Sequence, residues 1–213
     1  MDFDYVVQKR RSVRSFDPSR KLSFEVVAEI LDSARYAPSS GNLQNWSFIV
    51  IETQEKKDLA VRACPKQEFL SDASYLIIVL SRQENLVRYY GSRGEMLYSI
   101  QNCAAAIENM LLKATDLGVA SCWINAFDES AIKRDFSVPA DVRVQAIVAL
   151  GYSNEPHSDA NRHDLSFLVH FEAWGQKKEG RVFPISQKAI PKIEEKFERK
   201  KGFLSKIFKK DKI

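Results

Sequence analysis

The feature that most constrains the fold is a long helical pattern over residues 96–117. Its centre, Cys103-Ala-Ala-Ala-Ile107, is apolar on nearly every side, and Gly118 follows as a C-terminal stop signal. A helix that is apolar all round has to be enclosed by other elements. The pattern therefore predicts a buried helix that forms the spine of the fold.

Four short apolar runs predict the strands of a sheet. They cover residues 46–51, 75–80, 119–124 and 142–150 and are rich in β-branched and aromatic side chains. Helices are expected over 2–10, from Ser23 as N-cap to Pro38, over 54–63 and over 129–136. The run 165–174 suits either a strand or a helix. This mixture indicates an α+β or α/β protein without internal repeats, although the pattern does not order the strands.

Composition places the chain among ordinary globular proteins. It has 213 residues, 45% of them hydrophobic and 28% charged, which is enough for one sizeable core or two small ones. No apolar run approaches the ~18 residues that span a bilayer. The start, Met-Asp-Phe-Asp, has no signal-peptide pattern. We therefore expect a cytoplasmic protein.

Charge separates a body from a tail. Residues 1–175 hold 19 Lys and Arg against 23 Asp and Glu, a net charge of −4, whereas residues 176–213 hold 13 against 5, a net charge of +8. An acidic body argues against a nucleic-acid partner. In the tail, one helical face would carry Ile193, Phe197, Leu204 and Phe208, with lysines on another. Weak contact with a membrane surface, packing on a partner subunit and an unstructured basic tail all remain open.

Cysteine and histidine give no sign of a metal or disulfide site. Cys64, Cys103 and Cys122 are odd in number and widely spaced, and no Cys-x-x-Cys occurs. We expect ordinary buried thiols. The three histidines lack partners at ligand spacing.

Two early motifs carry the chemistry. Residues 9–14, Lys-Arg-Arg-Ser-Val-Arg, place cations beside a hydroxyl; alone, they would suit a solvated helix end. Residues 37–46, Ala-Pro-Ser-Ser-Gly-Asn-Leu-Gln-Asn-Trp, suit a helix-to-strand turn. Turn geometry does not account for Gln44 and Trp46 in addition. Together the motifs predict a site for a phosphate-bearing ring, split over two elements.

In tandem, the two motifs resemble the nitroreductase family of FMN-dependent oxidoreductases. That family has Arg-[Arg/His]-Ser-x-[Arg/Lys] and Ala-Pro-Ser-x-x-Asn-x-Gln-x-Trp at this separation. Residues 118–129 and 149–152 are similar to later signatures. The resemblance covers a domain of residues 1–175 and leaves 176–213 as a basic extension. It implies an α+β sandwich, with a mainly antiparallel sheet flanked by helices, and an entwined homodimer.

The resemblance also implies roles for residues of both motifs. Arg10 and Ser12 would serve the phosphate and ribityl end of FMN, and Arg14 would lie by the N1/O2 edge. Arg11 would contribute through its backbone. A loop would reach the flavin of the other subunit; its implied contacts are Pro38, Ser39, Ser40 and Asn42.

Later positions complete the implied site. Gln67 is similar to a residue that contacts the flavin pyrimidine. The segment Cys122, Trp123, Ile124 and Asn125 would run over the ring near N5, although Asn125 stands where many members have Gly. Gly151 and Arg162 match a late Gly-Tyr-Pro…Arg pattern in which the arginine reaches the phosphate; here Ser153 replaces the proline.

The implied activity is hydride transfer from NAD(P)H, through tightly bound FMN, to a nitroaromatic or quinone-like acceptor. NAD(P)H would be a transient co-substrate, since the chain has no Gly-x-Gly-x-x-Gly fingerprint. Positioning and electrostatics carry such catalysis, so no catalytic side chain is named. The alternatives are a narrow reaction, such as reductive dehalogenation or flavin fragmentation, and a flavin-binding or membrane-tethered protein without catalysis.

Overall fold

The sheet and its helices lie within the first of two units of the chain. The computed structural model describes residues 2–155 and 161–178. The chain divides after His157 into Met1–His157 and Ser158–Ile213. The basic extension from residue 179 onward, with the predicted amphipathic face of Ile193 to Phe208, lies outside the described residues.

The four predicted strands pair in one antiparallel sheet. They are β1 (Trp46–Ile51), β2 (Tyr75–Arg82), β3 (Ala120–Ile124) and β4 (Val142–Gly151). Their order is β1-β2-β4-β3, which leaves β1 and β3 at opposite edges. This sheet confirms the expected α+β class and its mainly antiparallel pairing.

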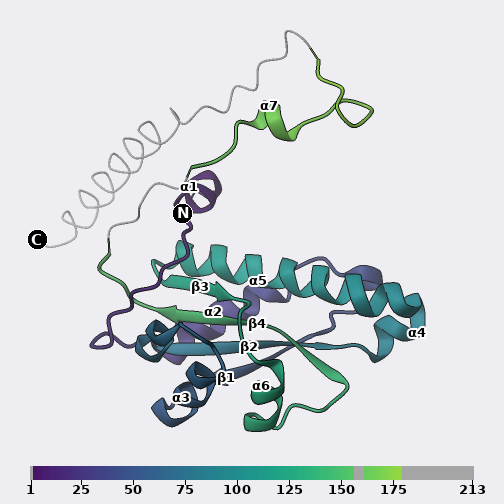
Figure 1. The fold of residues 1–213 in the computed structure, drawn as a ribbon. Helices are drawn as coiled ribbons and strands as arrows, with labels where there is room; N and C mark the ends of the chain where they lie inside the picture. The colour runs from purple at the N-terminus through teal and green to yellow at the C-terminus, as the bar shows by residue number, and fades with distance from the viewer. Residues whose placement is uncertain (1, 156–160, 179–213) are drawn as a thin grey trace, which may run out of the picture. The chain divides into compact units, whose positions relative to one another are not determined.

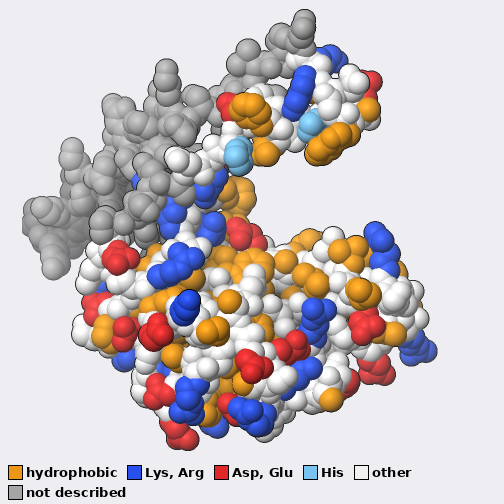
Figure 2. Space-filling model, viewed as in Figure 1, with side chains coloured by type: hydrophobic (Ala, Val, Ile, Leu, Met, Phe, Trp, Pro, Cys, Tyr) orange, Lys and Arg blue, Asp and Glu red, His pale blue; other side chains and the backbone are white. Residues whose placement is uncertain are grey.

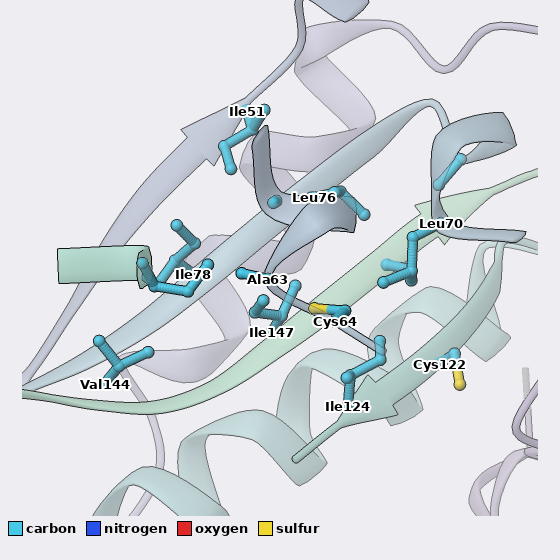
Figure 3. Close-up of a cluster of buried hydrophobic side chains, with 14 of the residues drawn as sticks. Ile51, Ala63, Cys64, Leu70, Leu76, Ile78, Cys122, Ile124, Val144 and Ile147 are labelled. Carbon is cyan, nitrogen blue, oxygen red and sulfur yellow. The ribbon is translucent and has the colours of Figure 1, made fainter. Parts of the chain in front are cut away.

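Helices cover both faces of the sheet (Figure 1). On one face α2 (Phe24–Ala34) packs against α5 (Ser99–Asp116) over side chains such as Ile77 and Val148. On the other face lie α3 (Gln54–Arg62) and α6 (Glu129–Asp135). Figure 3 shows this second core, which alternate residues of the strands fill: Ile51, Leu76, Ile78, Ile124, Val144 and Ile147. The period-2 alternation of strand side chains thus produces two apolar layers.

The long central helix differs from its prediction in two ways. It begins at Ser99, because a π-helical turn, η3 (Gly94–Tyr98), occupies its expected start, and an unpredicted helix, α4 (Glu84–Arg93), comes before that turn. Only one face of α5 is buried within the chain. Ile100 is 42% exposed, and Met96 in the preceding turn is 68% exposed. Figure 2 shows hydrophobic side chains gathered over this side of the unit. The centre of the helix, residues 103–107, is buried or half-buried as predicted, whereas Ile100, near its start, is exposed within a single chain.

Strand β4 contains a bulge where it pairs with β2. Val79 faces Ala146, but the next residue, Leu80, faces Val144. Gln145 is therefore an extra residue without a partner in β2. Bulges of this kind change the direction in which a side chain points and are frequent near functional sites.

The remaining differences concern short elements. Helix α2 ends at Ala34, earlier than the Pro38 signal predicted, and 3₁₀ turns η1 (Ser40–Asn42) and η2 (Glu68–Asp72) were not predicted. Helix α1 (Phe3–Lys9) lies within its predicted range. In the second unit the run 165–174 forms only the single turn α7 (Leu165–Leu168). Within residues 2–155 and 161–178, no helix is both long enough and apolar enough to cross a bilayer.

Candidate functional site

The N-terminal cation cluster lies along the free edge of β3. Helix α1 stops at Lys9, and the chain continues extended, so that Val13 N–H donates to Ser121 O at 3.0 Å and Ser12 forms a parallel bridge with Ser121. Val13 is buried, whereas Ser12 and Arg14 are exposed. In an extended segment alternate side chains point to opposite sides. Burial of Val13 thus turns Ser12 and Arg14 outward together.

The three arginines of the cluster have different partners. Arg10 Nε lies 3.6 Å from Glu108 Oε1 on α5. Arg11 Nη1 donates to the carbonyls of Gln8, at 2.6 Å, and Arg10, at 2.8 Å, so its guanidinium holds the local backbone. Arg14 has no ion-pair partner within the described parts of the chain. Its positive charge therefore remains available to a ligand.

The predicted segment of β3 lies beside these cations. Cys122 and Ile124 point into the core, so only their backbone can meet a ligand. Trp123 and Asn125 point the other way, and Trp123 Nε1 donates to Asn125 Oδ1 at 2.7 Å. Burial raises the pKa of the Cys122 thiol, and the nearby positive charge of Arg14 opposes part of that rise.

Two further predicted residues adjoin β3. Gln67 Nε2 donates to Ala126 O, just beyond the strand, at 2.8 Å. Gly151 pairs with Ala120, and a Cβ there would come within 2.8 Å of the Phe16 ring. The structure thus gathers one set of predicted residues around β3: Arg10, Arg11, Ser12, Arg14, Gln67, Cys122, Trp123, Ile124, Asn125 and Gly151.

A buried chain of amides holds the second motif against α5. The backbone N–H and the hydroxyl of Ser40 donate to Asn102 Oδ1 at 3.1 and 3.3 Å. Asn102 donates to Asn45 at 2.7 Å, and Asn45 donates to Ser81 on β2 at 2.8 Å. Asn45, Asn102 and Ser81 are all buried. Satisfied buried networks of this kind fix one conformation, so the loop is held rigidly.

Local backbone geometry shapes the same loop. Gly41 has φ +58°, and a Cβ at that position would lie 2.6 Å from the hydroxyl of Tyr90. Asn42 also has positive φ, and Ser39 Oγ accepts a hydrogen bond from Gln44 N–H at 3.0 Å. The Ser-Gly-Asn sequence therefore serves a tight left-handed turn, as its composition predicted.

The two motifs do not meet within one chain. The loop precedes β1 at one edge of the sheet, whereas the cation cluster lines β3 at the other, three strand spacings or about 14 Å away. They also lie at different heights. Trp46 is level with Ser81 and the start of β4, whereas Ser121 is level with Leu150 near its end, a separation of about 20 Å along the strands. The motifs occupy diagonally opposite corners.

The residues around β3 suit a phosphate-bearing ring. Within the described residues, they offer the Arg14 guanidinium without an ion-pair partner, the exposed Ser12 hydroxyl, and Arg10, whose counter-charge Glu108 is half exposed. These are the groups that bind phosphate. Arg162 lies in the second unit, where its guanidinium donates to Asn161 O at 3.2 Å. Its predicted phosphate contact remains a prediction.

The prediction that the cysteines are ordinary buried thiols is confirmed. All three are buried. Burial raises the pKa of Cys64 to about 11 and that of Cys103 to about 12. Neither thiol is therefore ionised to a useful extent at neutral pH.

Comparison with known proteins identifies the family. The family model described as "Nitroreductase family" matches residues 7–64 and 58–152, which include both motifs and the whole sheet. The chain belongs to the nitroreductase family. A nitroreductase family protein of Clostridium difficile 630, known from a crystal structure, is 30% identical to it. The similarity covers 81% of this chain and 99% of that one, with a TM-score of 0.72.

Other proteins similar to this chain differ in their named activities. A protein of Archaeoglobus fulgidus, named as an NADH dehydrogenase/NAD(P)H nitroreductase, is 31% identical over 176 residues, covering 79% of this chain and 97% of the relative. An iodotyrosine deiodinase of Thermotoga neapolitana is 23% identical over 185 residues, covering 75% and 93%. A solved FMN-dependent nitroreductase of Clostridium difficile R20291 is 29% identical with a TM-score of 0.67, covering 79% and 98%.

Proposed function

We propose that this protein is an FMN-dependent oxidoreductase that uses NAD(P)H to reduce a nitroaromatic or quinone-like acceptor by a ping-pong mechanism. The observation that carries the proposal is the alignment of the Arg10–Arg14 segment along β3, beside residues 122–125. Arg10, Ser12 and Arg14 would hold FMN, which would supply the redox chemistry between NAD(P)H and the acceptor. The relatives named for NAD(P)H and for FMN support both cofactor assignments.

The residues around β3 would divide the cofactor between them. Arg10 and Ser12 hold the phosphate end through charge-assisted hydrogen bonds. Arg14 places its charge at the ring edge on which negative charge develops during reduction. Trp123 and Asn125, fixed to each other by a hydrogen bond, form the wall beside the ring. These residues position and stabilise the reactants, and none acts as a nucleophile.

The protein works as a homodimer in this proposal. Two observations support a partner: the loop of residues 38–42 lies diagonally across the sheet from its own cation cluster, and one face of α5 is apolar but exposed. A second copy would cover that face and bring its Ser39-Ser40-Asn42 loop to the flavin. We expect this dimer to act in the cytoplasm.

The decisive test is purification followed by anaerobic reduction. We expect a yellow protein with about one FMN per chain, whose colour NADH or NADPH bleaches and an added nitroaromatic restores. A colourless protein that takes up no added FMN would overturn the proposal. A yellow protein that neither nucleotide bleaches would instead be a flavin-binding protein without this catalysis.

Reductive dehalogenation is a second candidate, favoured by the similarity to the iodotyrosine deiodinase. The two activities differ in their acceptor, since a deiodinase has to expel a halide from an aromatic ring. Halide release from iodotyrosine by the reduced protein, without reduction of nitroaromatics, would select this candidate.

A further inference from the structure

A cavity lies beside the proposed flavin position, between α5 and the ends of β3 and β4. Its volume is about 350 Å³, within the range of small-ligand pockets. Ile100, Ala104 and Ile107 of α5 form one wall, and Trp123 and Phe127 form another. Aliphatic and aromatic walls of this kind suit a planar ring.

The bulge in β4 gives this cavity a polar group. Val144 packs in the core beneath α3 and α6, and Ala146 packs in the core beneath α5. Gln145, the extra residue between them, lines the cavity. Its Nε2 is buried and has no hydrogen-bond partner among residues 2–155 and 161–178. A buried amide without a partner is costly and needs an explanation, which a ligand that accepts its hydrogen bond would provide.

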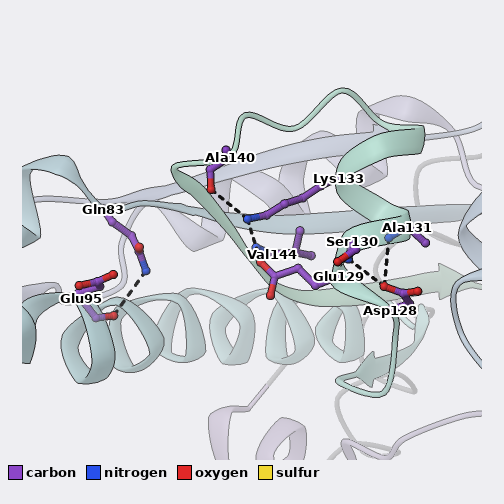
Figure 4. Close-up of polar contacts among 9 residues, drawn as sticks. All are labelled: Gln83, Glu95, Asp128, Glu129, Ser130, Ala131, Lys133, Ala140 and Val144. Carbon is purple, nitrogen blue, oxygen red and sulfur yellow. Dashed lines mark hydrogen bonds and ion pairs between the residues drawn. The ribbon is translucent and has the colours of Figure 1, made fainter.

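The other polar groups of the cavity leave mainly donors free. The Glu129 carboxylate is already occupied, because it accepts from Val144 N–H at 3.1 Å and pairs with Lys133 at 3.3 Å (Figure 4). The oxygen of Asn125 accepts from Trp123. Arg143, a further lining residue, has no side-chain hydrogen bond or ion pair within the described part of the chain. The cavity therefore favours a ligand that brings acceptor oxygens.

We propose that this cavity is the subsite for the electron acceptor and that Gln145 is its specificity-determining residue. The ligand class is a planar aromatic ring that carries a carboxylate, nitro or carbonyl oxygen, with that oxygen on Gln145 Nε2. The inference rests on the proposed function, because Trp123 and Asn125 line both this cavity and the proposed flavin position. It adds the recognition of the acceptor, which the family motifs do not specify.

The test is ligand binding to the full-length protein, with benzoate as a non-reducible probe and 4-nitrobenzoate as an acceptor. Gln145→Met keeps the length of the side chain and removes its donor. We expect both ligands to bind the variant about tenfold more weakly, the size of one lost hydrogen bond. The FMN content should stay unchanged. The melting temperature should rise by roughly 2–4 °C, because a buried unpaired amide is gone.

Gln101→Met is the matched control, since Gln101 is an exposed glutamine of α5 outside the cavity; its affinities should equal those of the wild type. Equal affinities in Gln145→Met would overturn the subsite, as would a dimer structure with a partner side chain filling the cavity. Calorimetric binding needs no turnover. Gln145-dependent benzoate binding by a colourless protein would therefore support the subsite and refute the proposed function. A yellow protein that reduces nitroaromatics but binds benzoate equally well without Gln145 would support the proposed function and refute the subsite.

Discussion

The ion pair between Arg10 and Glu108 predicts how tightly the chain holds a phosphate. The two groups are 3.6 Å apart, and their side chains are 24% and 47% exposed. At that distance two unit charges in bulk water attract each other by about 1.2 kcal/mol. Exposed pairs measure about 0.2–1 kcal/mol, because ordering the side chains and screening by salt reduce the attraction. Glu108 should therefore compete only weakly with an arriving phosphate for Arg10.

This weak competition fixes the expected changes in FMN affinity. Arg10→Ala removes a charge-assisted contact of roughly 1.5–3 kcal/mol and should raise the Kd about 10- to 150-fold. Glu108→Gln removes a competing and repelling carboxylate, so it should lower the Kd about two- to fivefold. Both effects should shrink as salt is added, because screening weakens interactions between exposed charges.

Both changes in the Kd can be measured by titrating the apoprotein into FMN and monitoring the quenching of flavin fluorescence. Glu29→Gln is the matched control, because Glu29 on α2 pairs with Lys113, a lysine elsewhere on α5, at 3.2 Å. This substitution should leave the Kd for FMN unchanged. An unchanged Kd in Arg10→Ala would show that Arg10 is a solvated cation. Weaker binding in Glu108→Gln would show that Glu108 orients Arg10 rather than competing for it.

Three further predictions follow from the structure and the proposed site. Arg14→Ala should lower the flavin reduction potential by about 30–60 mV while FMN still binds, as spectroelectrochemistry would show; loss of FMN without a shift would instead place Arg14 on the phosphate. Burial lowers the pKa of Lys57, whose Nζ donates to Ala73 O at 2.9 Å, below its ordinary value of 10.5. The unfolded chain then binds more protons, so urea-measured stability should rise as the pH approaches 10.5, and Lys57→Met should lose that slope. Sedimentation at micromolar concentration should find only dimers, and a folded, flavin-loaded monomer would contradict the entwined arrangement.

The sequence predicted the strands and the flanking helices well, because each carries its own local signal. Runs such as Leu76-Ile-Ile-Val-Leu80 have side chains that favour β-structure, and this run forms part of β2 in the structure. Helix α4 was missed because its sequence, Glu84–Arg93, is polar and contains Gly91. The neighbouring π-helical turn depends on Gly94, where a Cβ would lie 2.2 Å from Leu86 O, a close approach that no local pattern reveals.

Only those residues of the candidate site that belong to a local sequence motif could be predicted. The cations and the β3 segment came from local sequence, and the structure brings them together. Glu108, Asn102 and Gln145 were missed, because each acts through a contact with residues distant in the chain. The bulge at Gln145 arises from the pairing of β4 with β2, and strand register cannot be read from an isolated segment.

In the proposed homodimer, the diagonal separation of the two motifs has a genetic consequence. A chain damaged only in the 38–42 loop and a chain damaged only at Arg14 would each form dimers with two defective sites. In a mixed dimer of the two, one site would combine the intact loop with the intact arginine, and the other would hold both lesions. Two impaired alleles should therefore complement each other in one cell, because one of the two sites in each mixed dimer is intact. Lesions at Arg14 and Gln67 should not complement each other, because both residues adjoin the same strand.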